Sequence, residues 1–452
     1  MNKWDEEKVK GSAVRRHIST LLACLLCLCP MMNQSFAGSF AITNLSKTAD
    51  GVSLNWNNVT DRYIVAVSPS LATGRFQYVG NVISTNVAAV TNNLDTSFYR
   101  VRMVRVVQLP DTNLMRIVTQ AIPFRYEPTN QILDIDLEAI TYIDASASSI
   151  TNAAGIELLT GLLTLPIHSN SLSKLDVSGC TSLQTLYCWN NQITNLAVSG
   201  CANLQTLYCE NNLFTNLNVS GCPSLQNLYC ENNQIHGLNV AGCGSLQTVY
   251  CNNNNLRRLN FSGSPDLQLL ACHYNQLTNL NVSACTGLQT LYCWNNQLTS
   301  LDVSASPGLV ELYCYNNSLN NLDVSASTNI QTLYCHNNQI GTLTLPPCTN
   351  LQALWCSANQ LKDLEINAGN SIQTLSCQNN QLTNLNVMSC TNLQALYCYN
   401  NSLGSLDISS NRRLGYVEAS SNALTNIVVW WNPPGPTSWL HYTGNPTFTR
   451  GP

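Results

Sequence analysis

Two glutamates, Glu210 and Glu231, have a spacing that could support acid–base chemistry. They lie 21 residues apart in a sequence that repeats every 21 residues, so they belong to adjacent coils about 5 Å apart. Retaining glycosidases place their two carboxyl groups at a similar separation. Catalysis also needs a pocket that raises one pKa, and an open coil surface provides none. We therefore expect an ordinary solvated pair and no enzyme, with contact to a ligand or cation as the alternative.

Two histidines, His273 and His336, occupy the same repeat position as the glutamates. They lie three coils apart, roughly 14 Å at the spacing of parallel strands, so they cannot share a metal ion. The sequence has no glycine-rich phosphate loop, nucleophile elbow or HExxH motif. We expect no cofactor and no metal site.

The cysteines follow the repeat, whose positions we count from Leu183 as position 1. Of the 21 cysteines, three precede the repeats, eleven occupy position 6 from Cys188 to Cys398, and seven stand at coil boundaries. Parallel strands point such a column in one direction, whereas a disulfide needs converging Cβ atoms and a particular torsion. We predict buried free thiols that pack as small hydrophobic groups. A disulfide framework and a zinc site are the alternatives.

Aromatic side chains form a column at position 5, and position 7 varies from coil to coil. Tyrosine and tryptophan offer flat amphipathic area at low entropic cost, which suits protein hot spots and sugar-ring stacking. Duplication under structural demands alone should leave a uniform column, so the variation at position 7 indicates a contact surface. Neutral drift at position 7 and rigid scaffolding at position 5 are the alternatives. The candidate ligand-binding residues are Tyr187, Trp189, Tyr208, Glu210, Tyr229, Glu231, Tyr292, Trp294, Tyr313, Tyr315, Tyr334, His336, Trp355, Tyr397 and Tyr399.

Twelve repeat units in perfect register place these columns. The apolar residues that open the units are Leu183, Leu204, Leu225, Leu246, Leu267, Leu288, Leu309, Ile330, Leu351, Ile372, Leu393 and Leu414. The first unit reads LQTLYCWNNQITNLAVSGC, with apolar residues at positions 1, 4, 6, 11, 14 and 16. Two imperfect units precede it, around residues 140–150 and 162–177.

The alternation at positions 4 to 6 predicts a short strand, with position 5 pointing out from a concave face. The segment Leu196-Ala197-Val198 alternates again, so we expect a second short parallel strand on the far side of each coil. Six buried side chains contribute about 12 kcal/mol, whereas ordering 21 residues costs at least about 20 kcal/mol. No unit folds alone, and stacking must supply the difference.

Asparagine fills position 9 in all twelve units, from Asn191 to Asn422. Its amide can both donate and accept hydrogen bonds within a tight turn. We predict that it satisfies backbone groups of its own coil and of the neighbouring coil.

The pattern LxxLxCxxNxLxxLxVxxC over residues 162–429 resembles the bacterial 21-residue leucine-rich-repeat class called IRREKO, which belongs with the internalin-like proteins. The resemblance implies a leucine-rich-repeat solenoid with Leu or Cys at position 6. It also implies aspartate at position 15, present here in Asp302, Asp323 and Asp407. Members of the class are mostly surface or secreted proteins.

Two segments before the repeats carry further resemblances. Residues 38–106, with Trp56 and Tyr99 in alternating runs, resemble a small fibronectin type III or immunoglobulin-like sandwich. The segment PDTNLMRIVTQAI resembles the helical cap of internalin-type proteins, and Pro110 suits a first helical turn. We predict a mainly β chain with little helix. Its parts are a signal peptide (1–37), the sandwich (38–106), the cap with irregular first repeats (107–161), the solenoid (162–431) and a C-terminal cap or tail (432–452).

The N-terminus indicates export. Basic residues precede an uncharged, mostly apolar stretch from Ile18 to Met32, with a signal-peptide cleavage site near Ala37. The apolar stretch is shorter than the roughly 20 residues of a membrane span, and a lipid-modified start at Cys24 fits poorly. We expect a location in the periplasm, on the cell surface or outside the cell.

The composition restricts the partners. Charged residues make up 10% of the chain and the net charge is −4, which gives no electrostatic footprint for nucleic acid. We expect a monomer that binds a protein or glycan ligand on its aromatic concave face. A cell-surface spacer without a dedicated ligand and a carbohydrate-active enzyme are the alternatives.

Overall fold

A computed structural model of the chain describes residues 42–48, 51–56, 62–68, 77–83, 87–90, 98–123, 131–347, 350–366, 371–432 and 438–451. Side chains are described from residue 105 onward. The chain divides into two compact units, residues 1–108 with 123–136, and residues 109–122 with 137–452. The predicted signal peptide and Cys348 lie outside the described residues.

The first unit contains two three-stranded antiparallel sheets, in the orders β1-β2-β5 and β4-β3-β6, and a β7-β8 pair. Its strands are β1 (Ile42–Thr48), β2 (Gly51–Trp56), β3 (Arg62–Ser68), β4 (Gln77–Ile83), β5 (Val87–Val90), β6 (Phe98–Val104), β7 (Val106–Val107) and β8 (Ile132–Leu133). The likeness to a fibronectin type III domain remains a prediction, because the side chains of Trp56 and Tyr99 lie outside the described part of the chain.

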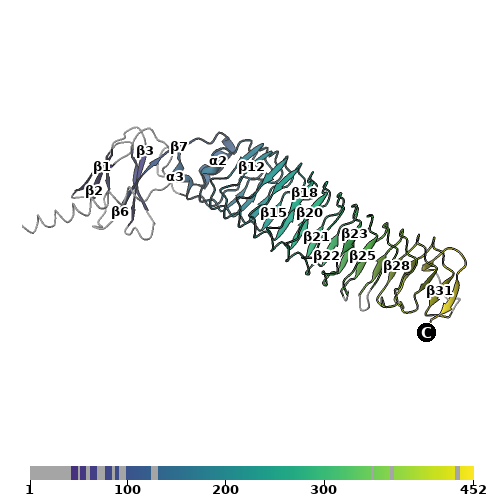
Figure 1. The fold of residues 1–452 in the computed structure, drawn as a ribbon. Coiled ribbons are helices and arrows are strands. Elements are labelled where there is room, and N and C mark those ends of the chain that lie inside the picture. The colour runs from purple at the N-terminus through teal and green to yellow at the C-terminus, as the bar shows by residue number, and fades with distance from the viewer. Residues whose placement is uncertain are drawn as a thin grey trace, which may run out of the picture. The chain divides into compact units, whose positions relative to one another are not determined.

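The second unit is a parallel β-solenoid, as predicted, and its coils follow one another along one axis (Figure 1). One 14-stranded parallel sheet, here called the long sheet, runs through it, and each strand pairs with the strand 21 residues earlier over most of its length. Its strands are β9 (Thr164–Pro166), β11 (Thr185–Tyr187), β13 (Thr206–Tyr208), β15 (Asn227–Tyr229), β17 (Thr248–Tyr250), β19 (Leu269–Ala271), β21 (Thr290–Tyr292), β22 (Glu311–Tyr313), β24 (Thr332–Tyr334), β26 (Ala353–Trp355), β27 (Thr374–Ser376), β28 (Ala395–Tyr397), β30 (Tyr416–Glu418) and β32 (Leu440–His441).

The far side of the coils also carries parallel strands, but they do not form one continuous sheet. They pair in twos or threes, as β10 (Lys174–Asp176) with β12 (Asn195–Ala197), β14 (Asn216–Asn218) with β16 (Gly237–Asn239), β18 (Arg258–Asn260) with β20 (Asn279–Asn281), β23 (Asn321–Asp323) with β25 (Thr342–Thr344), and β29 (Ser405–Asp407) with β31 (Asn426–Val429) and β33 (Thr447–Arg450). Position-15 side chains such as Asn218 and Asp302 accept the backbone N–H two residues later, in paired strands such as β14 and in coils without a far-side strand alike.

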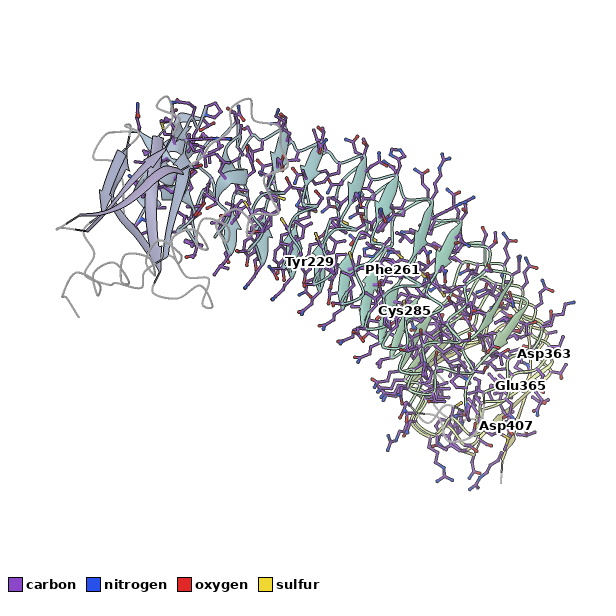
Figure 2. All side chains as sticks on the ribbon, turned by 60° about the vertical axis from the view of Figure 1, so that its left-hand side comes forward. Tyr229, Phe261, Cys285, Asp363, Glu365 and Asp407 are labelled. Atoms are coloured by element: carbon purple, nitrogen blue, oxygen red, sulfur yellow. The ribbon has the colours of Figure 1, made fainter. Side chains whose placement is uncertain are left out.

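The inside of the coils is filled by the predicted apolar columns. Leu183, Leu186 and Cys188 are fully buried, whereas Leu196 at position 14 is only half-buried. Figure 2 labels Phe261 and Cys285, which are fully buried among these side chains. The described cysteines of the repeats are all free and buried, which confirms the prediction of packed thiols.

The predicted asparagine ladder is present. The amide nitrogen of Asn254 donates to the backbone oxygens of Cys230, Cys251 and Asn252, at 3.0, 3.1 and 3.2 Å. Its oxygen accepts the N–H of Ile235 in the preceding coil at 2.9 Å. Each position-9 asparagine therefore holds its own turn and ties it to the coil before.

Helix α2 (Thr112–Ala121) belongs to the solenoid unit. It begins after Asp111, so Pro110 precedes the N-cap and does not open the first turn as predicted. The Asp111 carboxylate accepts the N–H groups of Asn113 and Leu114 and, through its other oxygen, that of Thr151. Asp111 thus joins the helix to the first coils. The other helices described are single turns, α3 (Asp134–Leu137) and η2 (Ile156–Leu158).

At the C-terminus, β32 extends the long sheet and β33 extends the far side. Trp430, Trp431 and Trp439 contact one another, with ring centroids 4.7 to 5.7 Å apart. In the described part of the chain, no helix has the length and hydropathy that a membrane crossing requires.

Candidate ligand-binding face

Positions 3, 5 and 7 of the coils from β9 to β30 point away from the core, and we call this surface the sheet face. Within each strand the central residue is buried and its two neighbours are mostly half-buried, as in Thr185-Leu186-Tyr187. All the candidate residues predicted from sequence lie on this face. Position 3 was missed by the sequence argument, although strand alternation assigns it to the same side as position 5.

The position-5 tyrosines of the first coils form a stack. The rings of Tyr187, Tyr208, Tyr229 and Tyr250 follow one another with centroids 5.0, 4.5 and 5.3 Å apart and interplanar angles of 7 to 12°. Parallel rings at this spacing cover each other's faces and leave their edges and hydroxyl groups toward solvent. The ring faces, which suggested stacking against the sugar rings of a ligand, are therefore largely covered by the neighbouring tyrosine rings.

A second cluster combines both columns. At position 7, His273, Trp294, Tyr315 and His336 stack with centroids 3.8, 5.5 and 4.4 Å apart. Four position-5 rings belong to the same cluster, and their centroids lie 4.6 to 5.0 Å from one another in successive coils. Their centroids lie 5.4 to 6.4 Å from those of the position-7 rings. The position-5 members are Tyr292, Tyr313, Tyr334 and Trp355.

The remaining predicted residues lie apart from these clusters. Trp189 stacks on His168 of the preceding coil at 4.0 Å. Tyr397 contacts Tyr416 at 5.2 Å. Tyr399 follows at position 7 of the same coil as Tyr397. The predicted surface is thus a series of aromatic groups, because Ala271 and Ser376 interrupt the position-5 column.

The coil that contains Ala271 also has an unusual residue in its turn. Position 8 has positive φ in every regular coil and is usually asparagine, which tolerates this conformation. Tyr274 occupies it with φ of 51° and is 54% exposed, and its ring contacts His273 at 5.7 Å. An exposed tyrosine in a left-handed turn costs stability and is a recognised mark of a functional position.

The two glutamates differ from the solvated pair that we expected. Glu210 and Glu231 are half-buried, and the Oε2 atom of each is enclosed without a hydrogen-bond partner among the described residues. Burial, reinforced by the neighbouring Glu231, raises the pKa of Glu210 to about 7. Burial also raises the pKa of Glu231. Flanking side chains enclose the carboxyl groups on a surface that the sequence suggested was open.

Burial disfavours the charged form of two histidines of the sheet face, His273 and His336. Burial lowers the pKa of His273 to about 4 and lowers that of His336, and the Nδ1 atom of each has no partner among the described residues. No group of three or more His, Cys, Asp or Glu side chains in the described ranges could hold a metal ion.

Comparisons with known proteins identify the family to which this solenoid belongs. The profile described as leucine-rich repeats (2 copies) matches residues 181–221, 286–327 and 328–368. The structure resembles the functional domain of InlJ from Listeria monocytogenes, described as including a cysteine ladder, at 30% identity and a TM-score of 0.58. The match covers 71% of this chain and 74% of that one. The chain belongs to the internalin-like leucine-rich-repeat proteins.

A second internalin from Listeria monocytogenes, InlF, shares the fold. It is 20% identical, with a TM-score of 0.50, and the match covers 70% of this internalin-like chain and 91% of InlF. A search of curated protein sequences finds no match. In this internalin-like protein the position-6 cysteines form a buried column beneath the sheet face, and burial raises the pKa of thiols such as Cys188 and Cys209 far above the ordinary range.

Proposed function

We propose that this internalin-like protein is exported and recognises a protein or glycan ligand with its sheet face. Export rests on the signal-peptide pattern of residues 1–37. Leucine-rich-repeat proteins are typically binding scaffolds without enzymatic activity. The observation that carries the proposal is the contrast between the two columns of the sheet face.

Position 5 is tyrosine in most coils, and its rings pack against one another, as a scaffold requires. Position 7 changes from tryptophan to glutamate, asparagine, histidine, tyrosine and serine along the same strand edges. Half-buried tryptophan and tyrosine side chains are enriched at the centres of binding surfaces. We therefore assign contact with the ligand chiefly to position 7, with the rims of the position-5 rings beside it.

One observation supports hydrolysis of glycans as a second candidate function. A carboxyl group with its pKa near 7 beside a second carboxylate is the arrangement of a general acid with its partner. This alternative predicts that glycans are cleaved and that Glu210→Gln abolishes the cleavage. Glycans that are bound and recovered intact would exclude it.

The test is an array of bacterial and host surface proteins and glycans probed with the purified protein. The variant carries Trp189→Ala, Trp294→Ala and Tyr315→Ala. A matched control carries Asn218→Ala, Asn239→Ala and Asn281→Ala at position 15 on the far side. We expect the first variant to lose the array ligands and the control to retain them. Equal binding by the first variant would contradict the proposal, and an array without ligands would favour a spacer protein.

A further inference from the structure

The charged side chains of the sheet face are all acidic. At positions 3, 5 and 7 from β9 to β30 the face carries Glu210, Glu231, Glu311 and Glu418 and neither lysine nor arginine. The wider strip from position 2 to position 10 also has no lysine or arginine in any of the twelve regular coils. The face therefore supplies no cation to its own carboxylates.

Two of these carboxylates accept hydrogen bonds from other residues, whereas the other two, within the described part of the chain, accept only from their own backbone N–H groups. Glu311 accepts a hydrogen bond from the Tyr292 hydroxyl, and Glu418 accepts from the backbone and hydroxyl of Ser420. Glu210 and Glu231 each keep an enclosed Oε2 atom without a donor among the described residues. An enclosed acceptor without a donor is costly, so some other group is expected to compensate.

The next coil contains a third enclosed acceptor oxygen without a donor among the described residues. Asn252 follows Glu231 at position 7, is only 9% exposed, and its Oδ1 atom has no donor among the described residues. The strands β13, β15 and β17 pair in register, so the three side chains stand in consecutive rungs. We call Glu210, Glu231 and Asn252 the acceptor row. It offers three acceptor oxygens without donors among the described residues, and negative charge on the two glutamates.

We propose that the acceptor row binds guanidinium or ammonium groups of a basic polypeptide, so that the ligand of the sheet face is a protein with a lysine- or arginine-rich segment. This inference rests on the proposed function and narrows it. The charge of the face complements such a segment, because the strip contributes carboxylates and no cation. An uncharged glycan would leave the carboxylates uncompensated.

The dimensions of the row suit this chemistry. Rungs of a parallel sheet are about 4.8 Å apart, and a guanidinium group has five N–H donors in a planar fork. One arginine can therefore donate to Glu210 and Glu231 together. The stacked rings of Tyr208 and Tyr229 lie beside the pair at position 5, and their side chains hydrogen bond to each other. They supply a rigid aromatic wall against which an arginine stem can pack.

The protonation of the pair supports the same reading. The titratable groups around Glu210 are Glu231, the hydroxyl groups of Tyr208 and Tyr229, and the buried thiols of Cys188, Cys209 and Cys230, and none of these side chains is a cation near neutral pH. Burial raises the pKa of Glu210 to about 7, so the negative charge develops fully above neutral pH. Binding of a cationic segment should therefore strengthen from pH 6 to pH 8.

The experiment uses calorimetric titration of the full chain at pH 8 and low salt. One probe is a peptide of about ten residues that alternates arginine and serine, and the other replaces each arginine by neutral citrulline. The test variant carries Glu210→Gln and Glu231→Gln. The control carries Asp302→Asn and Asp323→Asn, an equal change of charge at position 15 on the far side. Unfolding curves check that both variants fold.

We expect the arginine peptide to bind at least about tenfold more tightly than the citrulline peptide, and the glutamate variant to lose that margin. The aspartate control should stay within about twofold of the unmodified protein. Equal weakening by both variants, or equal binding of both peptides, would overturn the inference. If the array yields only glycans and the Trp189, Trp294 and Tyr315 variant still loses them, this inference fails while the proposed function stands.

Discussion

The side-chain oxygen of Asn254 accepts the backbone N–H of Ile235 from the preceding coil at 2.9 Å. The same amide donates to three backbone oxygens, those of Cys230, Cys251 and Asn252. One side chain thus satisfies four backbone groups from two coils. Because Asn254 is only 8% exposed, water cannot easily replace it, and the column should contribute strongly to stability.

Replacement of Asn254 tests this contribution. Asn254→Ala leaves buried backbone groups without partners and should lower the free energy of unfolding by about 2–4 kcal/mol. Asn254→Asp keeps the shape but sets a carboxylate against three carbonyl oxygens, so its loss should be at least as large. Urea unfolding measures both. Asn255→Ala, the control, removes one contact with Gln276 and should cost less than about 1 kcal/mol; equal losses at both positions would contradict the role of the column.

The position-8 column predicts a stabilising substitution. Ala358 has a φ of 52° at this position, where most coils have asparagine. Elsewhere in the column, the side-chain nitrogen of an asparagine donates to the side-chain oxygen of the asparagine in the preceding coil. Asn337 offers such an oxygen to an asparagine at position 358. Ala358→Asn should therefore raise the free energy of unfolding by about 0.5–1 kcal/mol. The reciprocal change Asn379→Ala should lower it. A thermal midpoint that falls with Ala358→Asn would contradict this account of the turn.

Replacement of cysteine by serine should have different effects at the coil boundaries and at position 6. The Cys201 thiol donates to the backbone oxygen of Val177 at 3.1 Å, and serine already fills the same column at Ser306, which donates to Cys285 at 3.1 Å. Cys201→Ser should thus change stability by less than about 1 kcal/mol. Cys209→Ser buries a hydroxyl where the described residues offer the sulfur no hydrogen bond, and should cost about 2–3 kcal/mol. Chemical unfolding distinguishes the two; similar costs would show that the columns are equivalent.

The pKa of Glu210 predicts a pH-dependent stability. Its folded pKa of about 7 exceeds the ordinary 4.5, so the folded chain keeps a proton that the unfolded chain releases. Stability should fall as pH rises from about 4.5 to 7, by about 1–2 kcal/mol once the partial exposure of the group is taken into account.

The comparison with Glu210→Gln isolates this contribution. His273, whose pKa is lowered to about 4, adds a slope of opposite sign below about 6.5 that both proteins share. We expect the variant to match the unmodified protein at pH 5 and to exceed its free energy of unfolding at pH 8. A variant that is less stable at pH 8 would contradict the burial of the carboxyl group.

The repeat made most of the solenoid predictable. A fixed spacing of Leu, Cys and Asn determines which side chains face the core and which turn amide reaches the preceding coil, because every unit faces the same neighbours. The division of the far side into strand pairs and one group of three was not predictable in this way, because position 15 carries the same local bond in paired strands such as β14 and β16. The first-turn role of Pro110 failed because Asp111 is the stronger cap.

The candidate face was predictable in position but not in character. Strand alternation placed Glu210 and Tyr208 on one surface. Whether their neighbours would enclose the carboxyl groups or cover the ring faces depends on side-chain packing between coils. The sequence pattern does not specify that packing, so the raised pKa of Glu210 and the edge-on presentation of the tyrosines became visible only in the structure.

The central claim is that position 7 contacts the ligand while position 5 supports the fold. The most direct test measures, for Trp294→Ala and Tyr313→Ala, both the dissociation constant of the strongest array ligand and the free energy of unfolding. We predict that Trp294→Ala weakens binding at least about tenfold, whereas Tyr313→Ala costs about 2–3 kcal/mol of stability with a smaller effect on binding. Unchanged binding by Trp294→Ala would contradict the account.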